Sequence, residues 1–223
     1  DMCFDKNGML LAGREGGSTF TVDPQTMKWQ ADPRYSVLYV NLPHLVVTRL
    51  FKDSRQHIWF GSWDKAVYRQ NAVTGEEESF THSDSDPFSF GVDEPIAFNE
   101  DKQGRVWIGG KYFGLYIYDP VNGRFYNYRH NSAKEGTLSH NRVNCIYIDR
   151  TGMVWLGTNN GISMYHPAQQ QFEQQFLPGN NEATDKPLVL YDFIKKDDGS
   201  LWIGTNEGVY IKTADGRYLL KKF

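Results

Sequence analysis

The chain has 223 residues, of which 39% are hydrophobic and 15% aromatic, so it can bury a core and is not a disordered polymer. A formal net charge of −3 without basic clusters argues against nucleic acid as the main partner. No apolar run approaches the roughly 18 residues that span a bilayer, so we expect no membrane insertion by this chain.

Residue usage favours strands and turns over helices. The chain holds 21 glycines and 13 tyrosines, and glycine and aromatic residues are typical of turns and strands respectively. Its two cysteines, Cys3 and Cys145, lie far apart without a CxxC neighbour, so we expect small buried residues and neither a zinc site nor a redox motif.

One phrase recurs along the chain. In each copy a large apolar residue stands two positions before a glycine. These residues are Leu11, Trp59, Trp107, Trp155 and Trp202, at intervals of 48, 48, 48 and 47 residues. Such regular spacing indicates five copies of one structural unit. We place the copies at 1–46, 47–93, 94–142, 143–188 and 189–223.

Each copy predicts four strands in the same order. An apolar stretch such as "NCIYID" (144–149) closes on a carboxylate and leads into a D-x-x-G turn, at 5–8, 101–104 and 149–152. Gln56 replaces the turn glycine in the second copy, and Lys196 replaces the aspartate in the fifth. The second strand follows as "IWFGS" (58–62), "VWIGG" (106–110), "VWLGT" (154–158) and "LWIGT" (201–205). Third strands such as "GLYIYDP" (114–120) and fourth strands such as "RFYNYRH" (124–130) complete the unit.

Four short antiparallel strands repeated every 40 to 50 residues are typical of a β-propeller blade. We therefore expect an all-β chain with about five blades, part of a larger propeller. The tryptophans should pack against the next blade, and the glycines two residues later should let its backbone approach closely. These structural repeat positions are Trp59, Trp107, Trp155, Trp202, Gly61, Gly109, Gly157 and Gly204.

The repeated sequence motif D-x-x-G-x-[VL]-W-[IL]-G-T, together with "GTLSHNRV" (136–143) between copies, resembles the two-component regulator propeller repeat. That resemblance implies the periplasmic sensor region of a hybrid two-component histidine kinase, a larger inner-membrane protein of bacteria that consume polysaccharides. It also implies signal transduction through the membrane, with carbohydrate as the stimulus.

The sequence contains few residue patterns that are typical of a catalytic site. No two of the six histidines have a metal-ligand spacing, and we expect His130 and His140 to be solvated loop residues. The recurring aspartates Asp5, Asp53, Asp101 and Asp149 are interpreted as turn formers and not as calcium ligands. We expect no metal, no cofactor and no catalytic residue in this chain.

Binding is the better prediction, because in propellers the loops between second and third strands gather on one face with the inter-blade linkers. Two of these loops carry aromatic side chains beside charged ones, a composition that suits an oligosaccharide: Trp63, Asp64, Lys111, Tyr112 and Phe113. The alternative is that these rings pack against a neighbouring blade or a second propeller.

The linkers add further polar residues near the expected channel mouth, namely His44, Glu94, His140, Asn141 and Arg142. Arg142 could receive the carboxylate or sulfate of an acidic sugar, or bond a neighbouring loop carbonyl in a purely structural role.

Three functions remain open. The first is a non-catalytic carbohydrate sensor part of the hybrid two-component protein. The second is a propeller enzyme such as a glycan-active lyase, and the third is a protein-interaction scaffold. Because an open arc of five blades would expose two apolar sheet faces, we also expect self-association or contact with a neighbouring propeller.

Overall fold

The computed structural model describes residues 2–4, 8–13, 19–31, 46–175, 177–178 and 188–222. Within these ranges the regular structure is entirely β-strand, without a helix. The predicted all-β class is therefore confirmed. Asp5, His44 and residues 14–16, where the first copy would have its loop between second and third strands, fall outside the described residues. The side chain of Cys3 and much of the linker at 176–187 do so as well.

The strands form five four-stranded sheets, each antiparallel and each in chain order from its inner to its outer edge. The sheets are β1 (Met2–Phe4), β2 (Leu10–Gly13), β3 (Thr19–Val22) and β4 (Trp29–Ala31); β5 (Val47–Lys52), β6 (His57–Ser62), β7 (Val67–Asn71) and β8 (Glu77–Phe80); β9 (Pro95–Glu100), β10 (Val106–Gly110), β11 (Leu115–Asp119) and β12 (Arg124–Tyr128); β13 (Val143–Ile148), β14 (Val154–Thr158), β15 (Gly161–His166) and β16 (Gln171–Gln175); and β17 (Leu190–Lys195), β18 (Leu201–Thr205), β19 (Gly208–Lys212) and β20 (Tyr218–Lys221).

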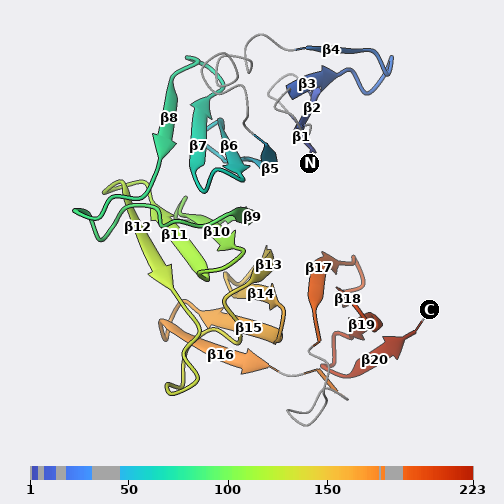
Figure 1. The fold of residues 1–223 in the computed structure, drawn as a ribbon. Coiled ribbons are helices and arrows are strands. Elements are labelled where there is room, and N and C mark those ends of the chain that lie inside the picture. Colours follow the sequence, from blue (N-terminus) through green and yellow to red (C-terminus); the bar gives the residue numbers. More distant parts are fainter. Residues whose placement is uncertain are drawn as a thin grey trace.

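The five sheets stand as blades around a common centre (Figure 1). Their first strands line the inside and lie next to one another in the order β1, β5, β9, β13 and β17. The fourth strand of each blade lies on the outer rim, namely β4, β8, β12, β16 and β20. The arc is open between the first and fifth blades. The predicted β-propeller architecture is confirmed, since consecutive blades cover each other's faces as the repeat requires.

The D-x-x-G turns form as predicted and also hold the tryptophans. The fourth turn position has positive φ at Gly104 (75°) and Gly152 (91°), and Gln56 adopts it at 68° in place of glycine. The aspartate does more than cap the turn. Asp101 Oδ1 accepts the backbone N–H groups of Gln103 and Arg105, while its Oδ2 accepts the indole N–H of Trp107 at 2.8 Å.

The repeat tryptophans lie between blades. Trp107 is completely buried, and its ring centroid is 5.2 Å from that of Tyr165 in the next blade. Trp59 has the same relationship to Tyr118, at 5.2 Å. Trp202, in the last blade of the arc, is only partly buried and is flanked by lysine side chains of its own blade. Burial of this position therefore depends on a following blade.

The repeat glycines show the same dependence. A Cβ on Gly109 would lie 2.5 Å from the carbonyl oxygen of Val143 in the next blade, and one on Gly61 would lie 2.8 Å from that of Pro95. A Cβ on Gly157 would meet Cys145 and the next blade's Leu190. Gly204 differs, because its nearest neighbour would be 3.9 Å away and within its own blade. The close approach expected of this glycine is thus absent at Gly204.

Candidate functional site

A β-bulge recurs near the start of every inner strand from β5 onward. In each, one residue is skipped in the pairing with the second strand. The skipped residues are Thr48, Ile96, Asn144 and Tyr191. A bulge twists the strand and redirects the side chain of the extra residue. Three of these residues, Ile96, Asn144 and Tyr191, line one pocket at this end of the inner strands, whereas Thr48 donates its hydroxyl to the backbone oxygen of Pro95 in the next blade.

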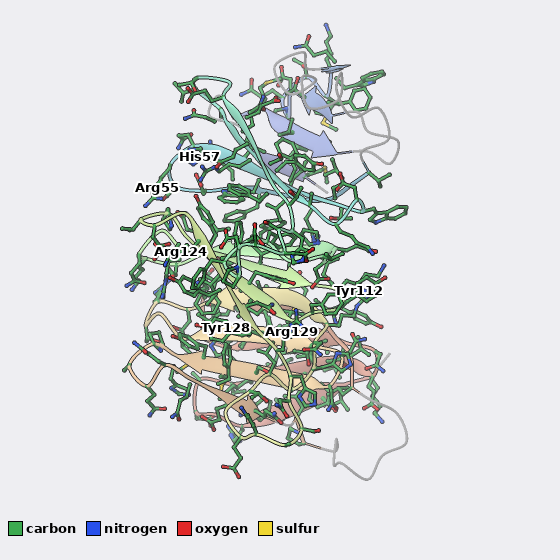
Figure 2. The ribbon with its side chains drawn as sticks, turned by 60° about the vertical axis from the view of Figure 1, so that its left-hand side comes forward. Arg55, His57, Tyr112, Arg124, Tyr128 and Arg129 are labelled. Carbon is green, nitrogen blue, oxygen red and sulfur yellow. The ribbon has the colours of Figure 1, made fainter. Side chains whose placement is uncertain are left out.

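The chain has two distinct faces. The loop face carries the loops between second and third strands and the linkers between blades, and the turn face carries the D-x-x-G turns. Figure 2 shows Tyr112 on one side of the molecule and Arg55 with His57 on the opposite side. All six predicted ligand-binding residues belong to segments of the loop face.

The loop between β10 and β11 is an ordered polar and aromatic patch. The Lys111 ammonium lies 2.6 Å from Glu94 Oε2, and Tyr112 donates its hydroxyl to Glu94 Oε1 at 3.3 Å. Tyr112 is 47% exposed and Phe113 38% exposed, and the guanidinium of Arg129 lies 4.9 Å above the Phe113 ring. The rings are thus presented to solvent on one side and held by charged neighbours on the other.

Asp93 fixes the conformation of this loop through hydrogen bonds to its backbone. This role was not predicted from the sequence. The Asp93 side chain is fully buried and accepts the backbone N–H groups of Glu94, Tyr112 and Phe113 at 2.8–2.9 Å. Burial raises the pKa of this carboxyl, and the N–H donors oppose that shift. A single aspartate in a linker gives no sequence signal for this role, because the donors come from a loop about twenty residues later.

Trp63 and Asp64 occupy the corresponding loop of the second blade. Trp63 is 54% exposed, and Asp64 Oδ2 accepts the hydroxyl of Tyr68 at 2.5 Å. The pKa of Tyr68 is raised mainly by burial, and the hydrogen bond to Asp64 raises it further. No ring contact joins Trp63 to Tyr112 or Phe113 in the part of the chain that the structure describes. The two aromatic loops are separate patches of one face.

Arg142 lines a pocket at the mouth of the channel, called here the channel-mouth pocket. Its volume is about 460 Å³, and its lining consists of Arg49, Ile96, Arg142, Asn144, Asn159, Val189 and Tyr191. Arg142 donates Nε–H to Asn144 Oδ1 at 2.9 Å, so its bond is to a side chain and not to a loop carbonyl. Asn144 in turn donates to Asn159 Oδ1 and to the backbone oxygen of Leu190.

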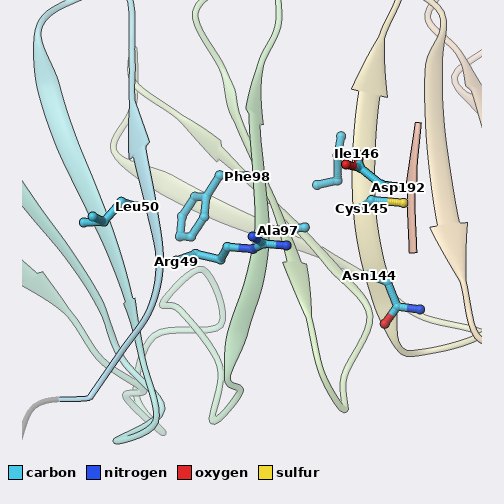
Figure 3. A pocket seen from close by; sticks show the side chains of 8 residues that line it. All are labelled: Arg49, Leu50, Ala97, Phe98, Asn144, Cys145, Ile146 and Asp192. Carbon is cyan, nitrogen blue, oxygen red and sulfur yellow. The ribbon is translucent and has the colours of Figure 1, made fainter. Parts of the chain in front are cut away.

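A second cavity of about 200 Å³ lies beside the same inner strands (Figure 3). It shares Arg49 and Asn144 with the channel-mouth pocket and adds Cys145 and Asp192. Arg49 extends from β5 toward β9, where its Nε–H donates to the backbone oxygen of Ile96 at 2.7 Å. Cys145 is buried with a raised pKa, mainly through desolvation, and is a protonated thiol at neutral pH.

The two linker histidines are loop residues that are only partly solvated, because each ring also bonds to the backbone. Both are partly buried. His130 Nδ1 lies 2.6 Å from the backbone oxygen of Leu138, and His140 Nδ1 accepts the backbone N–H of Arg142 at 2.9 Å. Burial, with His130 and Arg142 nearby, lowers the pKa of His140 and keeps its ring neutral. Among the described residues, no three His, Cys, Asp or Glu side chains are placed to hold a metal ion.

Radial blades with a bulged, polar channel mouth define a repeat protein of the β-propeller class. Two segments, 41–64 and 137–160, match the family model described as two component regulator propeller. These two segments therefore match the two-component regulator propeller repeat, the family that the repeated sequence motif resembles. No curated protein matches the sequence closely enough to count as a relative.

Several solved structures share the fold. The extracellular domain of the putative hybrid two component system BT3049 from B. thetaiotaomicron superposes with a TM-score of 0.75 at 18% identity, covering 98% of this chain and 29% of that one. PorZ, a surface component of the type-IX secretion system of Porphyromonas gingivalis, gives 0.66 at 18% identity, over 93% of this chain and 31% of that one. Streptogramin B lyase gives 0.69 at 17% identity, over 100% and 67%. The chain thus spans about a third or less of the first two.

No helix among the described residues is long and apolar enough to cross a membrane.

Proposed function

We propose that the chain is a non-catalytic, extracytoplasmic sensor part of a hybrid two-component signalling protein that responds to an oligosaccharide and relays the signal to a histidine kinase. Two observations support the signalling part. The chain carries two-component regulator propeller repeats, and its fold resembles an extracellular domain of a putative hybrid two component system. Periplasmic placement follows from the same two observations and is part of the proposal.

The observation that carries the ligand class is the composition of the loop face. Trp63, Tyr112 and Phe113 present large apolar rings to solvent, and each stands beside charged or hydrogen-bonding groups. A sugar has the same two-sided character, since its C–H face stacks on aromatic rings while its hydroxyls bond polar partners. Asp93 holds one of these loops in place before any ligand arrives, which lowers the ordering cost of binding.

A propeller enzyme is the second candidate, because the fold is shared with streptogramin B lyase and with a putative gluconolactonase. Fold likeness alone does not carry a chemistry from one protein to another. A protein-interaction scaffold is the third. The three candidates differ in what the purified chain does with a glycan. A sensor binds the glycan, an enzyme cleaves it, and a protein-interaction scaffold does neither.

The test is calorimetric titration of the purified chain with a panel of oligosaccharides. We expect saturable binding that Trp63→Ala or Tyr112→Ala weakens by about tenfold, the value of a stacked ring. The matched control is Trp29→Ala, which removes a tryptophan that is 68% exposed on the outer strand β4, away from the loop face.

Chromatography of the titrated glycans separates the remaining candidates. New reducing or unsaturated ends would establish an enzyme. Absence of heat with every glycan, in a chain that melts cooperatively, would leave the scaffold.

A further inference from the structure

We propose that the channel-mouth pocket binds the carboxylate of a uronic-acid sugar, with the Arg142 guanidinium as the charged partner and Tyr191 as the ring platform. The inference rests on the proposed carbohydrate sensing and narrows its ligand to an acidic class. It moves the centre of recognition from the loop tips to the channel mouth.

Arg142 is held in one orientation by a chain of hydrogen bonds. Its Nε–H donates to Asn144 Oδ1, and its backbone N–H donates to the ring of His140. Asn144 is itself fixed by donating to Asn159 and to the backbone oxygen of Leu190 in the next blade. Because a guanidinium has five N–H donors in a rigid fork, fixing Nε orients the terminal nitrogens that can bind a carboxylate through two parallel bonds.

The bulges place the partners of Arg142 around it. Asn144 and Tyr191 are the skipped residues of β13 and β17, so both side chains are turned from the regular alternation toward the channel mouth. Tyr191 is 56% exposed while lining the pocket, and its ring offers a free face on which a sugar can stack. One pocket therefore combines an oriented cation, two amides and an aromatic ring.

The charge of the lining favours an anion. Arg49 and Arg142 contribute positive charge, and none of the seven residues that line the pocket is a carboxylate. The nearby Asp192 lines the second cavity, which it shares with Arg49, so the charge that favours an anion in the channel-mouth pocket rests mainly on Arg142. Partial burial strengthens a charge-assisted bond relative to the same bond at a free surface.

The size of the pocket also fits. Its volume of about 460 Å³ falls within the roughly 300–1,000 Å³ that is usual for small-ligand sites. The pocket opens beside the linker of 129–142, on the same face as the aromatic loops. A uronic-acid unit in the pocket could continue as an oligosaccharide across that face.

The test compares matched ligands on the whole chain. Trisaccharides of galacturonic and glucuronic acid are titrated at pH 7 and low salt beside their methyl esters, which keep the shape and lose the charge. We expect at least one acid to bind about 10- to 100-fold more tightly than its ester. Arg142→Gln should remove that preference by weakening the acid far more than the ester, and Arg142→Lys should recover only part of it, because lysine lacks the fork.

Arg150→Gln is the control, since Arg150 is an exposed arginine in the D-x-x-G turn of the blade that begins directly after Arg142, on the opposite face. It should leave the preference intact. Equal binding of acid and ester would overturn the inference, and so would equal weakening of both by Arg142→Gln. In either case the binding of the esters would still support carbohydrate sensing. Failure of every acid, with neutral glycans of the panel still binding, would overturn it in the same way. Failure of all glycans would overturn both.

Discussion

The indole N–H of Trp107 donates to the carboxylate of Asp101 over 2.8 Å, and this bond joins the turn face to the interface between two blades. Asp53 and Trp59 repeat it at 2.9 Å, and Asp149 and Trp155 at 3.5 Å. In the fifth blade Ser200 accepts from Trp202 instead, and its own hydroxyl donates to Asp198. The aspartate and tryptophan of the repeat are therefore one structural pair, because a buried indole N–H needs an acceptor.

The pair predicts a large loss of stability on Asp101→Ala. Asp101 accepts two backbone N–H groups, the Arg105 side chain and the buried indole, and all four donors lose their acceptor. We expect the free energy of unfolding to fall by about 2–4 kcal/mol, measured by urea denaturation. Asp198→Ala, in the fifth blade, should cost clearly less, because Asp198 is exposed and reaches the Trp202 indole only through Ser200. Similar losses in the two variants would contradict the pairing.

The repeat glycines predict a contrast between two identical substitutions. Gly109→Ala would bring a methyl group to 2.5 Å from the backbone oxygen of Val143, so the third and fourth blades must move apart. We expect a loss of about 1–3 kcal/mol in thermal or urea unfolding. Gly204→Ala meets nothing closer than 3.9 Å, and it should be neutral or stabilise by up to about 1 kcal/mol. A destabilised Gly204→Ala would show that spacing between blades is not the reason for the glycine.

His140 predicts a loss of stability in mild acid. Its pKa is lowered from 6.5 in the folded chain, mainly by burial, so between the lowered value and 6.5 the unfolded chain binds the extra proton. Stability is complete above about pH 6.5 and falls as the pH drops, by at most about 1.4 kcal/mol per pH unit for one group. His140→Gln keeps an acceptor for the Arg142 N–H and should flatten this slope.

The measurement is the urea midpoint between pH 7.5 and 5. Asp93 works in the opposite direction, because its raised pKa means that the folded chain takes up the proton first, so Asp93→Asn is the second comparison. An unchanged slope in His140→Gln would refute the assignment.

The open side of the arc predicts self-association. Trp202 is only partly buried, and Ile194 on the same blade is 58% exposed, whereas the corresponding faces of the inner blades are covered. We expect light scattering to give a mass that rises with protein concentration above that of the 25.7 kDa chain. Ile194→Lys should shift the equilibrium toward monomer, and Val121→Lys, at an 89% exposed turn position, should not. A monomer at every concentration would contradict the prediction.

Much of the architecture follows from local patterns. The spacing of Trp59, Trp107, Trp155 and Trp202 and the D-x-x-G turns predict the number of units, their four strands and their stacking, because strand alternation and turn chemistry are short-range properties. The candidate site follows less well. The aromatic loops and Arg142 could be selected by residue type, but nothing local marks Asp93, whose hydrogen-bond donors lie in another segment.

The amino-acid sequence by itself thus determined the repeat, the strands and the class of protein. Only the tertiary structure decided which residues meet at the channel mouth. Asn144 and Tyr191 look like ordinary strand residues until the pairing with β14 and β18 skips them, and their partners come from neighbouring blades. The physical reason is that a bulge and an inter-blade contact are properties of register and packing, which join residues more than forty positions apart.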